Sequence, residues 1–232
     1  MSEGSRISVL TREGKRKTAQ ELVAQNLRLW VVDGTLRPGD RINVDSVAES
    51  IGCSIIPVRE ALRVLAKENI ITLIPHRGAY VRVLSSDEIE EVYWVRQIIE
   101  TRALGNAIPN LVQDDWNKLQ AMINEMDRVA ETGDILGYMA IDQEFHLSMY
   151  RKYNSDYLMG LSADAYHASQ AYRLAHAKLP GRPQQGNREH KELLAALMRR
   201  DITAAQTILQ KHLQNTADYL IEFVRQQENI VR

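Results

Sequence analysis

Four side chains that can bind a metal interrupt apolar helical stripes in the C-terminal half of this 232-residue chain: Asp142, His146, His190 and His212. Asp142 and His146 are four residues apart, so they lie on one face of a helix. His190 and His212 each lie in a later stripe that is otherwise apolar. Three helices are therefore predicted to direct one carboxylate and three imidazoles toward a common interior.

Buried polar groups need partners, because an unsatisfied one costs about 1–3 kcal/mol. A divalent transition metal bound by three histidines and one aspartate would satisfy all four groups at once. We expect zinc first, with nickel, manganese or iron as alternatives, because these ligand types do not select among the metals. The competing interpretation is that the histidines are core residues hydrogen-bonded to their neighbours.

The elements that must position these groups are helices. The region that starts at Ser85 shows only helical periodicity, and Ser85 and Glu88 form a capping-box pattern at its beginning. Asp134 and Asp201 are predicted N-caps. The sequence therefore predicts an all-α antiparallel helical bundle over residues 85–232. The predicted helices span 86–107, 113–132, 135–153, 155–178, 187–200 and 202–227, with a loop, LPGRPQQG, at 179–186.

A different pattern precedes the bundle. Three short helical stripes are followed by two β-rich runs, ITLIP and AYVRV, which a turn at His76-Arg77-Gly78 joins into a hairpin. Three helices and a hairpin within about 65 residues are the winged helix-turn-helix arrangement. We place this domain at residues 18–84, after a flexible basic arm at residues 1–17. The predicted fold class is mainly α.

Composition limits the location and partners of the protein. Residues 1–84 carry 13 Lys and Arg against 9 Asp and Glu, whereas residues 85–232 carry 16 against 21. This asymmetry favours a nucleic-acid module joined to an acidic domain. Cys53 is the only cysteine, and neither a secretory signal nor an 18-residue apolar stretch occurs. We therefore expect a cytoplasmic protein without a membrane partner.

The N-terminal motifs resemble a known family. The run from Leu36-Arg-Pro-Gly-Asp through Ser54-Ile-Ile-Pro-Val-Arg-Glu-Ala-Leu to Pro75-His-Arg-Gly-Ala-Tyr-Val is similar to the GntR superfamily of bacterial transcription regulators. VRQIIE, with Arg96 and Glu100, followed by the bundle, resembles the FadR-type subgroup with an FCD effector domain. The resemblance implies a regulator that binds operator DNA, most often as a repressor, and that responds to a small organic acid. Because one operator carries two half-sites, we expect a homodimer.

Several residues at the start of the predicted recognition helix can contact DNA. Arg59 lies one turn into the helix, where it can contact a guanine or a phosphate, although an ion pair with Glu60 or Glu49 is the alternative. Arg63 lies one turn further along and is expected at the DNA backbone. Ser54 is a predicted N-cap that can donate to a phosphate.

The hairpin tip and one departure from the family pattern complete the predicted DNA interface. Arg77 can enter a minor groove, Gly78 permits the tight turn, and His76 lies beside them. Ile55 and Ile56 stand where relatives usually carry Arg-Thr, so we expect a different operator half-site, with Ile55 against a thymine methyl. The alternative for Ile56 is simple burial.

The resemblance also matches Asp142, His146, His190 and His212 to the metal ligands of FCD domains. Arg96 is the first candidate to pair with the carboxylate of the effector, and Arg173 is the second. The alternative for each arginine is a structural ion pair, for example Arg96 with Glu100.

Two other functions remain possible from the residues alone. A metal centre with open coordination positions can activate water, which would make the chain a metalloenzyme, but the usual catalytic motifs are absent. The third interpretation is a regulator whose metal is purely structural. In that case small carboxylates would leave DNA affinity unchanged.

Overall fold

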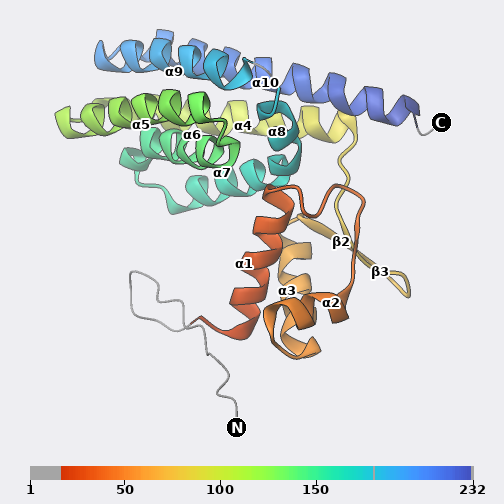
Figure 1. Cartoon of the computed structure of the whole chain (residues 1–232). Helices are drawn as coiled ribbons and strands as arrows, with labels where there is room; N and C mark the ends of the chain where they lie inside the picture. The colour runs from red at the N-terminus through yellow and green to blue at the C-terminus, as the bar shows by residue number, and fades with distance from the viewer. Residues whose placement is uncertain (1–16, 180, 231–232) are drawn as a thin grey trace.

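The computed structural model describes residues 17–179 and 181–230, which form two units with separate hydrophobic cores (Figure 1). The elements of the N-terminal unit are α1 (Ala19–Val32), β1 (Arg41–Ile42), α2 (Val44–Ile51), α3 (Ile55–Lys67), β2 (Ile71–Ile74) and β3 (Gly78–Val81). Those of the C-terminal unit are α4 (Ser86–Ala107), η1 (Ile108–Asn110), α5 (Gln113–Thr132), α6 (Ile135–Tyr150), η2 (Arg151–Tyr153), α7 (Asp156–Ala168), α8 (Gln170–Ala177), α9 (Arg182–Met198) and α10 (Ile202–Ile230). The predicted arm at residues 1–17 lies, except for Lys17, outside the described residues.

Local signals set the boundaries of the helices in the N-terminal unit. A capping box between Thr18 and Glu21 starts α1, and Asn43 caps α2. Gly52 ends α2 in the left-handed conformation, with φ +72°. Ser54 stands at the N-cap of α3, as predicted, but its side chain forms no cap hydrogen bond. The helices place Val23, Leu27, Val58 and Leu65 with other apolar side chains in one core.

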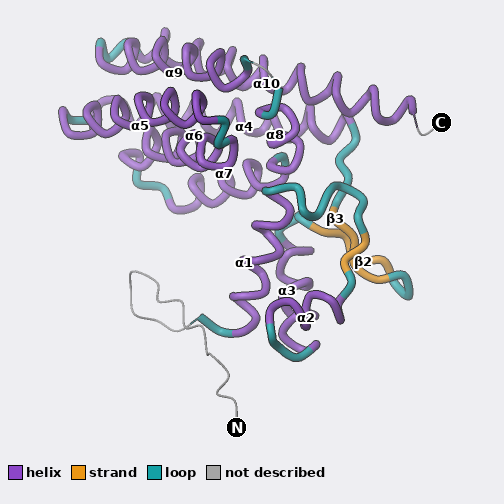
Figure 2. Tube along the Cα trace, in the orientation of Figure 1, coloured by secondary structure: helices purple, strands orange, loops and turns teal. Residues whose placement is uncertain are grey.

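The wing, which is the β-sheet of the N-terminal unit, contains one strand more than the sequence predicts. β2 and β3 form the expected antiparallel hairpin, and β1 adds to the other edge of β3, which gives the strand order β1-β3-β2. Figure 2 shows the hairpin projecting from the helices. A two-residue strand leaves too few positions for a period-2 pattern, and for this reason the sequence did not reveal β1.

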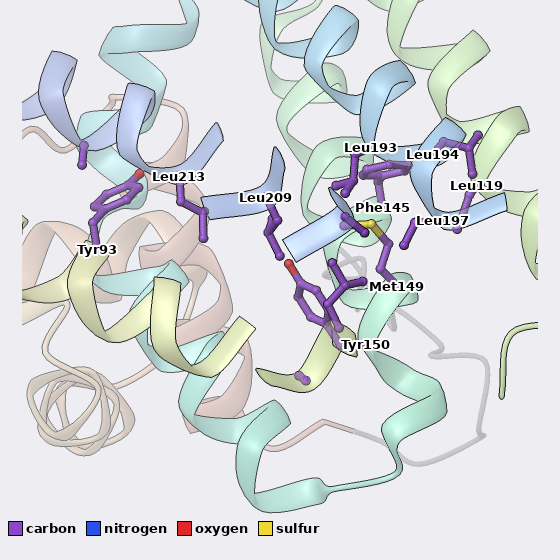
Figure 3. Close-up of a cluster of buried hydrophobic side chains, with 14 of the residues drawn as sticks. Tyr93, Leu119, Phe145, Met149, Tyr150, Leu193, Leu194, Leu197, Leu209 and Leu213 are labelled. Atoms are coloured by element: carbon purple, nitrogen blue, oxygen red, sulfur yellow. The ribbon is translucent and has the colours of Figure 1, made fainter. Parts of the chain in front are cut away.

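The C-terminal unit is the predicted helical bundle. The long helix α10 packs along α4, and α5 packs against both α6 and α9. Figure 3 shows side chains of α5, α6, α9 and α10 meeting in the core, among them Phe145, Met149, Leu194 and Leu209. The capping box at Ser85 and Glu88 and the side-chain caps at Asp134 and Asp201 are present as predicted.

The largest differences from the predicted helix boundaries occur at three places. The helix expected at 135–153 ends as α-helix at Tyr150 and continues as one 3₁₀ turn. The helix expected at 155–178 breaks at Ser169, whose hydroxyl donates to the carbonyl of Tyr166. The predicted loop at 179–186 ends early, because α9 begins at Arg182. Pro183 is tolerated in its first turn, since the N–H groups of a first turn make no hydrogen bond within the helix.

The two units are in contact through α8. Leu84, in the linker between β3 and α4, donates its N–H to the hydroxyl of Tyr172 on α8 at 2.7 Å. Gly34, just after α1, is so close to α8 that an added Cβ would stand 3.4 Å from the Leu174 side chain. Figure 1 shows α8 beside the C-terminal end of α1. This short helix therefore joins the bundle to the N-terminal unit, called the winged unit below.

Candidate functional site

The bundle brings the four predicted metal-binding residues together. Asp142 and His146 project from α6, His190 from α9 and His212 from α10, and one ligand atom of each lies within 4.8 Å of the others. Asp142 Oδ1 is 3.4 Å from His190 Nε2 and 3.9 Å from His146 Nε2. Ligands about 2.0–2.2 Å from a common ion would stand roughly 3–4 Å apart. The separations are thus close to those of a metal site.

Outer hydrogen bonds orient two of the imidazoles. Tyr150 donates its hydroxyl proton to Glu100 Oε2 at 2.6 Å, so its oxygen accepts from His146 Nδ1 at 3.2 Å. Glu189 Oε2 accepts from His212 Nδ1 at 2.6 Å. Both rings therefore donate from Nδ1, and Nε2 is the nitrogen available to an ion. Metal-bound histidines are oriented by partners of this kind.

His190 provides the test of whether a metal fits. Its side chain is fully buried, and neither ring nitrogen has a hydrogen-bond partner among the described residues. Burial, and after it the neighbouring His212, lower the pKa of His190 to about 3, so the ring is neutral at pH 7 and can coordinate. A hydrogen-bonded core histidine, the competing interpretation, would have a partner. The donor set and this unpaired imidazole fit a transition metal.

Asp142 is held as a carboxylate. Burial by itself would raise its pKa, but the Arg173 guanidinium, followed by the three imidazoles, keeps the pKa of Asp142 well below its usual value. Arg173 forms an ion pair with Asp142 Oδ2 and lies 3.9 Å above the ring of Tyr166. Arg173 therefore lies directly beside the candidate metal centre, the group formed by Asp142, His146, His190 and His212.

Arg96 occupies a different position from the one expected for an effector-binding residue. It is 2% exposed and its Nε donates to Glu100 Oε1 at 2.6 Å, which is the predicted alternative of an i, i+4 ion pair. Through Glu100 and Tyr150 it supports His146. Arg96 thus acts as part of a hydrogen-bonded chain behind the centre, and it does not line the adjoining cavity.

A cavity of about 60 Å³ adjoins the centre. Asp142 and His212 form part of its wall, and Arg173 reaches it from α8. A cavity of this size has room for a few water-sized groups and hence for a small acid. The remaining lining residues are Tyr138, Met139, His176, Ala177, Arg182, Pro183, Gly186, Glu189 and Thr216.

Three polar residues of this cavity, His176, Arg182 and Glu189, are not identified by sequence reasoning. The helical pattern gives His176 and Glu189 no partner, and Arg182 falls in the predicted loop at 179–186. Glu189 reaches His212 on a different helix, so only the packing of α9 on α10 reveals it. The positive charge of Arg182 beside a proline gave no usable signal.

The predicted recognition residues form an exposed surface. Ser54, Arg59 and Arg63 are exposed at or near the N-terminal half of α3. Arg63 pairs with Glu60 at 2.5 Å, whereas Arg59 has no hydrogen bond or ion pair within the described residues, so its predicted alternative is not adopted. Ile55 and Ile56 are 39% and 73% exposed, which excludes the burial alternative for Ile56.

The wing presents its predicted residues at the surface as well. His76, Arg77 and Gly78 are exposed, and His76 and Gly78 adopt φ values of +60° and +108°. The guanidinium of Arg41 would be 3.7–3.8 Å from a Cβ at Gly78, so it lies beside the wing tip. Arg41 is therefore a further cation of this surface that sequence reasoning missed, because β1 was missed.

Among the described residues, no helix has both the length and the apolar character needed to cross a bilayer.

Comparisons with known proteins match both units. Residues 19–81 match the model of the bacterial regulatory proteins of the gntR family, and residues 91–215 match the FCD domain. The chain is 30% identical to the HTH-type transcriptional regulator McbR of Escherichia coli over 132 residues, 57% of this chain and 60% of McbR. It is 23% identical to the HTH-type transcriptional repressor RspR of E. coli over 225 residues, 96% and 97% of the two chains. The solved structure of E. coli McbR/YncC superposes with a TM-score of 0.79 at 25% identity, covering 89% of this chain and 98% of that one.

Proposed function

The chain belongs to the GntR family of bacterial regulatory proteins and carries an FCD domain, and from this premise we propose how it regulates transcription. It is a DNA-binding transcriptional regulator, and its relatives and its fold are those of regulators rather than enzymes. We propose that it is a homodimeric repressor. A small organic acid, bound at a divalent metal in the bundle, controls its affinity for the operator.

One observation carries the effector proposal: Asp142 and His212 belong both to the metal-binding group and to the wall of the cavity. A metal there would offer open coordination positions to a carboxylate. Asp142, His146, His190 and His212 would hold the metal, and Arg173 would orient the acid by a charge-assisted hydrogen bond. Arg96 would support His146 instead of contacting the acid.

The DNA contacts follow from the exposed surface of α3 and the wing. Arg59 reads base edges in the major groove, with Ile55 against a thymine methyl. Arg63 and Ser54 contact phosphates, and Arg77 enters the minor groove beside His76 and Gly78.

A homodimer is proposed because one operator with two half-sites needs two reading heads. An apolar surface on α4 supports this proposal. Trp94 and Ile98 are 63% and 51% exposed, and the neighbouring Val95 is 37% exposed on the same side of the helix. Large apolar side chains gathered on one helix face are typical of an interface. We therefore place the second copy of the chain against α4.

Regulation is proposed to pass through α8. Arg173 and His176 of this helix line the cavity, while Tyr172 and Leu174 contact the linker and the end of α1. An acid that prefers one position of α8 would favour one placement of the winged unit. By linkage, operator DNA would change the affinity for the acid by the same factor.

The test combines metal analysis with operator binding. We expect about one metal per chain by mass spectrometry. Binding to a short palindromic operator should weaken with salt, and an organic acid should change it only in the metal-loaded protein. No metal after reconstitution with zinc, nickel and manganese would overturn the metal proposal. Acids that bind without altering operator affinity would indicate a purely structural metal.

A further inference from the structure

A second polar group lines the cavity, apart from the candidate metal ligands. His176 on α8 stacks on Tyr219 with ring centroids 4.1 Å apart, and the Arg182 guanidinium carbon is 5.7 Å from the centroid of the same ring. Both residues line the cavity that Asp142, His212 and Arg173 also line. A molecule in this cavity would therefore meet one set of polar groups at the centre and another beside Tyr219.

Three nitrogen atoms of these lining residues are buried without a hydrogen-bond partner among the described residues: Arg173 Nη1, His176 Nε2 and Arg182 Nε. Arg182 Nη1 donates to the neutral Gln185 side chain at 2.7 Å. A buried donor left unpaired costs about 1–3 kcal/mol. The two guanidinium nitrogens are donors, and His176 Nε2 is a third in the tautomer that carries its proton there, so the set indicates a ligand with several acceptor oxygens.

The charges around the cavity point to a dianion. The carboxylates of Asp142 and Glu189 balance the guanidiniums of Arg173 and Arg182, so a bound divalent metal would leave two positive charges without a counter-ion. α9 also begins at Arg182 without a side-chain cap, which adds the partial positive charge of a helix N-terminus. A monocarboxylate would neutralise only half of this charge.

We propose that the effector is a small dicarboxylate, with one carboxylate at the centre beside Arg173 and the other bound by Arg182 and His176. This inference rests on the proposed function and specifies the class of acid. The cavity volume of about 60 Å³ limits the ligand to a few carbon atoms between the two carboxylates.

The experiment compares two acids of equal chain length. Succinate and butyrate both have four carbons, and only succinate carries a second carboxylate. Isothermal titration calorimetry on the zinc-loaded full-length protein should show succinate binding at least ten times more tightly than butyrate. Zinc content is measured before and after each titration, because a loss of zinc would indicate chelation.

Variants locate the second carboxylate. Arg182→Met keeps the aliphatic stem and should weaken succinate at least tenfold but butyrate less than threefold. Arg182→Lys should restore part of the preference. Arg188→Met is the matched control, because Arg188 is exposed on the same helix, and it should leave both affinities unchanged. His176→Phe keeps a ring on Tyr219 and should lower the preference for succinate, which provides a test if Arg182→Met does not fold.

The outcomes separate the two proposals. Equal affinities for succinate and butyrate, or equal weakening of both acids by Arg182→Met, would overturn the dicarboxylate proposal and leave an acid effector in place. Failure of both acids to bind at millimolar concentration to the zinc-loaded protein would overturn the acid effector itself. A preference for succinate that depends on Arg182 would support both.

Discussion

The recognition surface and the metal-binding group place polar side chains in opposite environments. Arg59 is exposed and has no partner among the residues that the structure describes, and Ile56 beside it is 73% exposed, whereas His190 is fully buried and Asp142 nearly so. Side chains that contact DNA need only be exposed at the surface, because the DNA binds there from solution. Groups that hold an ion must be oriented in advance, and for this purpose Glu189, Tyr150, Glu100 and Arg96 surround the centre.

The two regions also differ in what a single change should do. A substitution on the exposed surface removes one contact with DNA and leaves its neighbours in place. A substitution in the centre also disturbs the residues that orient it. Substitutions should therefore separate the two regions: a change in the recognition surface should weaken DNA binding alone, and a change in the metal-binding group should weaken metal binding alone.

The largest effect is expected from His190→Ala combined with His212→Ala. Removing two of four ligands should reduce the metal content from about one per chain to almost none. Operator affinity without effector should change little, because the winged unit has its own core. Mass spectrometry and fluorescence anisotropy measure the two quantities, and His167→Ala serves as the control. Parallel loss of metal and DNA binding would contradict the separation of the regions.

The next largest effect is expected at the proposed dimer surface. Trp94→Glu places a charge in the apolar surface on α4 and should weaken dimerisation by about 2–4 kcal/mol, the range of a central interface residue. Tyr157→Glu, at an exposed site on α7, is the control. Sedimentation equilibrium measures the dissociation constant. A dimer of unchanged affinity would place the interface elsewhere.

Arg59→Ala should act on the recognition surface alone. Loss of a base contact is expected to cost about 1–3 kcal/mol of operator affinity, with discrimination relaxed at one base pair. Metal content should equal that of the parent. Arg188→Ala, at an exposed site on α9, is the matched control. Equal weakening on all sequences would instead assign Arg59 to a phosphate.

The smallest effect is expected where the two regions meet. Tyr172→Phe removes the hydroxyl that accepts from the Leu84 N–H, a bond worth about 0.5–1.5 kcal/mol. The acid should still bind, but its effect on operator affinity should fall a few-fold. Titrations of operator with and without succinate measure this coupling. A coupling equal to that of the parent would mean that the two units communicate by another route.

Local patterns predicted much of this molecule. The capping residues Ser85, Asp134 and Asp201 lie beside the chain segments that they organise, so the sequence locates those helix ends. The i, i+4 spacing of Asp142 and His146 placed both on one face of α6. The break at Ser169 was missed because a hydroxyl competed with the helical hydrogen-bond pattern, a choice that periodicity does not reveal.

The sequence by itself determined the two units, their helical character and the inventory of residues able to hold a metal or read DNA. Only the tertiary structure decided which of two arginines lies at the centre. Arg96 forms an ion pair with Glu100 on its own helix, whereas Arg173 forms one with Asp142 on another helix. It also decided that Glu189 orients His212 and that Arg182 and His176 share a cavity. The physical reason is that spacing along one helix sets a direction, whereas distances between helices depend on how their apolar faces pack.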